Sequence, residues 1–132
     1  VTLTNTQSIN TSTLTKILFD NEVIDSNNDF TSNTWTPTVA GKYLVVGNVQ
    51  MQSMEDTDKL KTDLYKNANC VARTALTLGA GTTGGVCVAM IMDMNGSTDT
   101  GELRITHDNG SSKNAGNTTV DGSYLMAFKI AE

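Results

Sequence analysis

The chain has 132 residues, a formal net charge of −5, 38% hydrophobic residues and only 17% charged residues. That length fits one domain, and the acidic balance argues against a nucleic-acid-binding protein, whose Lys and Arg gather on one face. No apolar run reaches the roughly 18 residues that span a bilayer, so we expect no membrane insertion. No signal-peptide pattern opens the chain. It begins at Val1 rather than Met, as in a processed product or a piece of a longer chain.

Short β-strands separated by turn residues follow one another along the chain, without helical periodicity. Residues 1–14 are polar with scattered Leu, which predicts a tether or an edge strand. Residues 15–132 form one domain, with no internal repeat or linker. The predicted strands are 14–19, 22–24, 30–35, 42–52, 60–66, 71–78, 86–94, 102–107 and 123–131. Regularly spaced short strands of this kind predict an all-β antiparallel sandwich of jelly-roll type.

Three strands, 42–50, 86–94 and 123–131, are apolar on both alternate sets of residues. In the first of them, Tyr43 and Leu44 begin the two sets. An antiparallel strand with one wet face should be apolar on one side only. We therefore expect both faces of these strands to be covered, either by a closed sandwich core or by another copy of the chain.

No motif predicts catalysis. Residues 79–84 match the dinucleotide-binding glycine pattern, but a strand follows them where the mechanism needs a helix, so a flexible loop is predicted. His107 is the only histidine and has no nucleophile or orienting partner, so we expect a solvated residue at a strand end. We predict no catalytic residue, no cofactor and no enzyme activity.

No metal site is predicted either. Cys70 and Cys87 lack Cys or His neighbours at ligand spacing, and the acidic loop 53–59 lacks the glycine and closing glutamate of a calcium-binding hand. The two cysteines should also remain unlinked. Cys70 begins a strand that ends near Leu78, about 26 Å away, and Cys87 follows the next loop, whereas a disulfide needs Cα atoms within about 7 Å.

A motif around the strand at 42–52 indicates a family. Phe30 and the run Trp35-Thr36-Pro37-Thr38-Val39-Ala40-Gly41-Lys42-Tyr43-Leu44-Val45 resemble the aromatic, Thr-Pro and Ala-Gly-x-Tyr signature of complement C1q/TNF-like jelly rolls. Residues 16–25, 65–67 and 123–127 fit the same family in order. The likeness extends over nearly the whole chain after residue 14 and is closest to bacterial-virus and environmental members.

The resemblance implies a homotrimer around a threefold axis. Tyr43, Val45, Leu125 and Ala127 would then lie in the sandwich core. The residues turned toward the axis, and so in the trimer interface, would be Leu44, Val46, Asn48, Val88, Met90, Met92, Tyr124, Met126 and Phe128.

The same resemblance implies a non-enzymatic virion structural protein, the head of a fibre, spike or capsid decoration at the virion surface. Its work would be host attachment or capsid structure, with other virion proteins and a host surface glycan or protein receptor as partners. The alternative is a secreted or cell-surface binding module, located outside the cell. An enzyme, such as a glycan hydrolase on a fibre, would need a carboxylate pair that we cannot place.

Alternating strand directions predict which loops lie together. Loops 53–59, 79–85 and 108–122 should share one end, and turns 67–69 and 95–101 should lie at the other end with Glu132. Loops can vary without disturbing a scaffold, so the first end is the candidate receptor-facing one. Its candidate residues are Glu55, Asp56, Asp58, Asn109, Ser111, Ser112, Lys113 and Asn114. The alternative is that these loops are only solvated and the domain is a structural plug or ornament.

Overall fold

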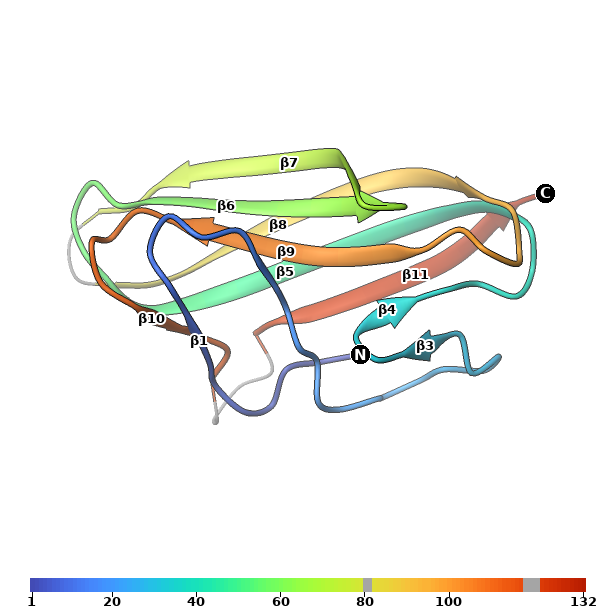
Figure 1. The fold of residues 1–132 in the computed structure, drawn as a ribbon, viewed down its shortest axis with the longest axis horizontal. Coiled ribbons are helices and arrows are strands. Elements are labelled where there is room, and N and C mark those ends of the chain that lie inside the picture. The colour runs from blue at the N-terminus through green and yellow to red at the C-terminus, as the bar shows by residue number, and fades with distance from the viewer. Residues whose placement is uncertain (80–81, 118–121) are drawn as a thin grey trace.

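The computed structural model describes residues 1–79, 82–117 and 122–132 (Figure 1). The fold is all-β, and no helix that could cross a membrane occurs in these ranges. The strands are β1 (Gln7–Ile9), β2 (Thr15–Lys16), β3 (Phe30–Thr31), β4 (Thr34–Trp35), β5 (Gly41–Met54), β6 (Lys59–Lys66), β7 (Asn69–Thr77), β8 (Thr82–Met94), β9 (Gly101–His107), β10 (Lys113–Ala115) and β11 (Tyr124–Ala131).

The strands form two antiparallel sheets stacked as a sandwich (Figure 1). In the first sheet, β5 pairs with β8 on one edge and with β11 and then β10 on the other, and β1 pairs with β10. The second sheet has the order β3-β4-β9-β6-β7, with β2 also paired to β9. The predicted all-β antiparallel sandwich is confirmed.

One apolar core lies between the sheets. The residues of β5 alternate between buried and more exposed positions, as the two-residue period of a strand requires. The core residues from the long strands include Tyr43, Val45, Val49, Met51, Leu60, Leu64, Val86, Val88, Met92, Leu103, Ile105 and Leu125. Leu3 and Ile9 are buried as well, and residues 7–9 form β1, which pairs with β10 at the edge of the first sheet.

The motif at 35–43 builds one corner of this core. The rings of Trp35 and Tyr43 meet edge to face, with 5.0 Å between their centroids. The Tyr43 hydroxyl donates a 2.7 Å hydrogen bond to the Val39 carbonyl, and burial raises the pKa of this phenol. Asp29 accepts hydrogen bonds from the backbone N–H and the hydroxyl of Thr38, at 3.0 and 2.9 Å. These contacts fix the polar turn that leads into β5.

Local structure departs from the predictions in the first third of the chain and again in the loop before β11. Residues 30–35 are a tight hairpin rather than one strand, because Ser32 and Asn33 both adopt left-handed backbone angles. Only Thr15–Lys16 of the predicted strand 14–19 is a strand, and 22–24 is not one. Within the predicted loop 108–122, residues 113–115 form β10.

Gly47 brings the two sheets close together. A Cβ atom added there would overlap the Leu103 side chain, which is 1% exposed in β9 of the opposite sheet. We expect Gly47→Ala to lower the free energy of unfolding by roughly 1–3 kcal/mol, because a well-packed core must shift to admit the methyl group. Urea denaturation measures this. Gly79→Ala is the matched control, because no atom lies within 4 Å of its added Cβ.

The overlap also predicts coupling between the two positions. Leu103→Ala alone should cost roughly 2–5 kcal/mol through the cavity that it leaves. The Gly47→Ala/Leu103→Ala double variant should lose clearly less than the two single losses combined. Additive losses would contradict the packing argument.

Candidate binding surfaces

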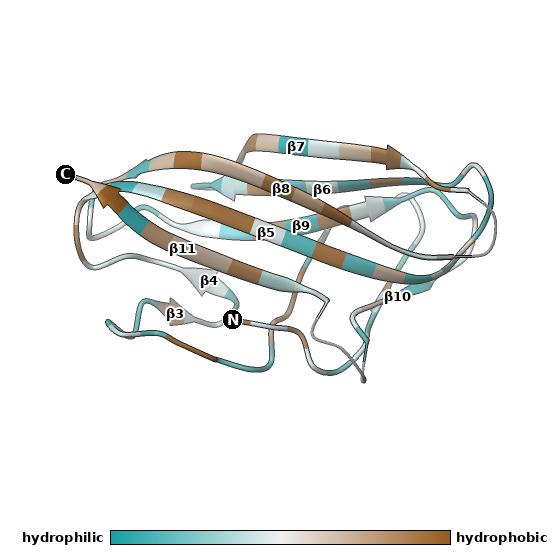
Figure 2. Ribbon diagram, turned by 180° about the vertical axis from the view of Figure 1, so that it is seen from behind, coloured by the Kyte–Doolittle hydropathy of each residue, from teal (hydrophilic) through white to brown (hydrophobic). Residues whose placement is uncertain are grey.

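The strands β8, β5 and β11 of the first sheet contain many hydrophobic residues (Figure 2), and the residues on the outer side of this sheet are mostly apolar. The neighbouring strands β8, β5 and β11 each contribute three outward residues to this side. Strand pairing aligns these residues in three rows, with one residue from each strand in every row. We call these nine residues the apolar face. They are Ile91, Leu44 and Phe128 in the first row, Ala89, Val46 and Met126 in the second, and Cys87, Asn48 and Tyr124 in the third.

The apolar face is open to solvent in the single chain. Phe128 is 55% exposed, Ile91 54%, Met126 39% and Leu44 37%. Large apolar side chains scattered over a surface need no explanation, but a contiguous group on three strands indicates an interaction site. The face is bounded by charge at one end, where the Lys42 ammonium lies 3.3 Å from the Asp93 carboxylate.

The outer face of the second sheet is charged instead. Both oxygens of the Asp63 carboxylate accept hydrogen bonds from the Arg73 guanidinium, at 2.7 and 2.6 Å, and these bonds raise the pKa of Arg73. Glu102 bridges Lys16 at 3.0 Å and Arg104 at 2.8 Å. A face with these ion pairs is satisfied in water. These charged groups are therefore already paired with one another.

The structure brings together six of the nine predicted interface residues and corrects the other three. Leu44, Val46, Asn48, Tyr124, Met126 and Phe128 lie on the apolar face. Val88 and Met92 are instead 3% and 2% exposed and belong to the core. Met90 lies on their side of β8, opposite Val45, but it is 37% exposed at this edge of the sheet and is not part of the core. The prediction for β8 was therefore wrong by one residue.

The residues that the prediction missed on β8 are Cys87, Ala89 and Ile91. Both alternate sets of this strand are apolar, so alternation alone could not choose between them. Two signals were present. The missed set ends at Asp93 and includes small Ala89, whereas the opposite set has bulky residues throughout.

The candidate receptor-facing loops do lie together, and they are tied to one another. The Asp58 carboxylate accepts hydrogen bonds from the Glu55 backbone N–H at 2.5 Å and from the Asn109 amide at 2.6 Å. Lys113 lies 3.3 Å from Glu55. Burial acts to raise the pKa of Asp58, but these donors and the Lys113 charge outweigh it, so that pKa lies below its ordinary value.

Not every residue of this group is free to bind. Asp58 is 8% exposed and serves the loop itself, and Lys113 and Asn114 belong to β10, where they pair with β1. Asp56, Ser111 and Ser112 are exposed. The opposite end of the sandwich holds the turns 67–69 and 95–101, where the Asn67 amide bonds Asp99 at 2.7 Å. For the residues that the structure describes, loops 53–59 and 108–112 lie at one end and turns 67–69 and 95–101 at the other, as predicted (Figure 1). Residues 80–81 and 118–121 of the predicted loops lie outside the described ranges.

His107 differs from the prediction of a solvated residue. It is 1% exposed, and its Nε2 lies 3.0 Å from the Ile9 carbonyl oxygen, because β1 covers this end of β9. Cys70 and Cys87 are both unpaired and exposed, one in each sheet. No three His, Cys, Asp or Glu side chains of the described ranges gather as metal ligands would. The glycine pattern at 79–84 lies partly outside those ranges.

Comparison with known proteins gives no relative to argue from. No protein-family model matches the chain, and a search of curated proteins finds no match.

Proposed function

We propose that the chain is a non-enzymatic, trimeric C1q/TNF-like jelly-roll domain that forms the head of a virion fibre, spike or capsid decoration. The proposal rests on one observation above all, the solvent-exposed apolar face on β8, β5 and β11. Its role would be attachment to a host surface or reinforcement of the capsid.

The path of the chain supports the jelly-roll assignment. From β5 onward the chain passes to the second sheet for β6 and β7, returns for β8, crosses again for β9 and ends in the first sheet with β10 and β11. Repeated crossing between two antiparallel sheets is typical of Greek-key sandwiches. The residues of the family signature also lie together, since the rings of Trp35 and Tyr43 meet edge to face and Tyr43 bonds Val39 in the turn between them.

The apolar face supports self-association. Each square ångström of apolar surface withdrawn from water stabilises an assembly by roughly 25 cal/mol, so covering this face contributes several kcal/mol. Closed symmetric assemblies cover such a patch without leaving a copy of it exposed. A threefold arrangement around β5 and β11 would also leave the ion-paired face of the second sheet in water.

The carboxylates support a structural rather than a catalytic role. Asp25 accepts hydrogen bonds from the backbone N–H groups of Asp29 and Phe30, Asp29 binds Thr38, and Asp63 binds Arg73. Each of these side chains is already occupied in holding a turn or a pair of strands.

Two measurements test the proposal. Sedimentation velocity at micromolar concentration should give a mass of about 42 kDa, three times the 14.1 kDa of one chain. A stable monomer would defeat the trimer. Immunogold labelling of a culture that makes the protein should decorate virus particles. Label confined to cell surfaces would replace the virion assignment by the cell-surface binding module.

Receptor contact by the loop end is a separate prediction. Replacing Glu55, Asp56 and Ser111 together by Ala should weaken adsorption to host cells by about tenfold, equivalent to roughly 1.4 kcal/mol, with the assembly intact. Glu132→Ala, at the other end, is the control and should change nothing. Unchanged adsorption of an intact triple variant would leave these loops merely solvated.

A further inference from the structure

The chain contains two Asn-Gly steps, at 95–96 and 109–110, and serine follows each of them. An Asn-Gly step can convert its asparagine to aspartate without an enzyme. The glycine nitrogen attacks the side-chain Cγ atom, a five-membered succinimide forms, and the amide nitrogen leaves with the glycine N–H proton as ammonia. Water then opens the ring to aspartate or isoaspartate. Glycine has no Cβ atom to hinder the backbone rotation that this attack needs.

Because the local sequences match, tertiary structure decides between the two steps, and it holds the first one in place. The Asn95 side-chain oxygen accepts hydrogen bonds of 2.9 to 3.0 Å from three backbone N–H groups, those of Ser97, Thr98 and Asp99. Gly96 is packed against the turn that precedes β5, since a Cβ atom added to it would lie 2.3 Å from the Ala40 nitrogen. Rotation at this step therefore requires the turn at 95–101 to open.

The second step is free to rotate. Gly110 is exposed, it has a left-handed backbone angle (φ 89°), and no atom lies within 4 Å of a Cβ atom added to it. Residues 108–112 lie between β9 and β10 and belong to neither sheet. The Gly110 N–H donates to a side chain, the Thr11 hydroxyl at 3.1 Å, so its release for the attack disturbs no strand pairing.

The Asn109 amide is also oriented by its neighbours. The Ser111 hydroxyl donates at 2.8 Å to the Asn109 side-chain oxygen, where negative charge gathers during the attack, and such a donor stabilises that charge. The amide nitrogen, which leaves, donates at 2.6 Å to the Asp58 carboxylate. Asn95 has more donors on its oxygen, but the packing of Gly96 hinders the attack there. The freedom of the glycine thus decides between the two steps.

We infer that Asn109 is a site of spontaneous deamidation, which the fold favours over Asn95. The co-reactant is water, and the inference depends neither on the trimer nor on the virion assignment. The reaction changes the contact that joins loops 53–59 and 108–112. In place of an amide donor, residue 109 would present a carboxylate to the Asp58 carboxylate, and the two like charges would repel. The two loops should then separate at the end of the sandwich that carries the candidate receptor-facing residues.

Peptide mapping by mass spectrometry tests the site. The tryptic peptide 74–104 contains Asn95, the tryptic peptide 105–113 contains Asn109, and neither contains another asparagine. After incubation of the folded protein at mildly alkaline pH, we expect deamidation in 105–113 to be at least about tenfold faster than in 74–104. In concentrated urea both steps lose their tertiary contacts, so the two rates should converge. Equal rates in the folded protein, or a faster reaction at Asn95, would overturn the inference.

The variant Asn109→Asp reproduces one product and tests its effect on the loops. In the parent protein the Glu55 backbone N–H donates to the Asp58 carboxylate at 2.5 Å. We expect hydrogen exchange of this amide to become about tenfold faster in Asn109→Asp, because repulsion between the carboxylates loosens the loop. Asn109→Ala is the matched control, since it removes the donor without adding a charge, and it should have a smaller effect. Exchange at Glu55 that stays at the parent rate in Asn109→Asp would contradict the separation of the loops.

Discussion

Replacing Met126 and Phe128 together by Asp should convert the proposed trimer to a monomer and leave the domain folded. Both side chains are more than a third exposed in the single chain, so the fold tolerates a carboxylate at either position. In the assembly the same positions would be buried, and each copy would bring two charges into an interface without partners. We expect the dissociation constant to rise at least about a thousandfold, equivalent to roughly 4 kcal/mol.

Sedimentation velocity measures the mass, and thermal melting by circular dichroism confirms the fold. Leu76→Asp is the control, because it introduces one such carboxylate at a residue of similar exposure outside the apolar face. It should remain a trimer. A Met126→Asp/Phe128→Asp protein that still sediments as a trimer would remove the apolar face as the interface.

Replacing Arg73 by Met should destabilise the domain by roughly 2–3 kcal/mol. The Asp63 side chain is 0% exposed, and Arg73 supplies the hydrogen bonds to both of its oxygens. Breaking a buried pair on one side leaves an uncompensated charge, which costs about 3–5 kcal/mol. The Arg73 side chain is half exposed, so water offsets part of that cost.

The double variant Asp63→Leu/Arg73→Met should recover most of this loss, because an apolar pair leaves no charge to solvate. Lys61→Met, on the same strand, is the control and should stay within about 0.5 kcal/mol of the parent in urea denaturation. An Arg73→Met protein as stable as the parent would show that the carboxylate is satisfied by water.

Sequence patterns predicted the long strands and missed the short ones, for physical reasons. β5, β6, β9 and β11 have strong β-forming residues bounded by turn residues, and their predicted and observed limits nearly coincide. β10 is Lys-Asn-Ala, which shows no alternation, and it forms because β1 and β5 offer open edges on both sides. Such tertiary pairing leaves no local signal.

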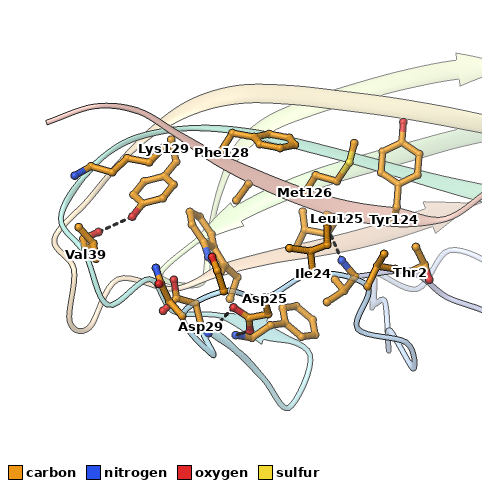
Figure 3. Close-up of a pocket in the computed structure, with 18 residues that line it drawn as sticks. Thr2, Ile24, Asp25, Asp29, Val39, Tyr124, Leu125, Met126, Phe128 and Lys129 are labelled. Carbon is orange, nitrogen blue, oxygen red and sulfur yellow. Dashed lines mark hydrogen bonds between the residues drawn. The ribbon is translucent and has the colours of Figure 1, made fainter.

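The resemblance, rather than the alternation, assigned the faces of the long strands. It placed Tyr43, Val45 and Leu125 on the core side of β5 and β11, where the structure buries them. On β8 both sets are apolar until Asp93, and the resemblance turned toward the axis a set whose Val88 and Met92 are buried in the core. The pocket that Val23 and Ile24 form beside Leu125 of β11 had no sequence signal, because it depends on how residues 23–29 pass that strand (Figure 3).

The register of β11 against β5 determines how the domain would respond to mechanical force. β11 ends beside Lys42, at the start of β5, with seven of its residues paired along that strand. A pull on Glu132 against the loop at 55–58, at the far end of the sandwich, would load all of these pairs in shear at once. A pull on Glu132 against the turn at 95–101 would instead peel β11 away one pair at a time. The domain should therefore withstand much greater tension along its length than across its C-terminal end.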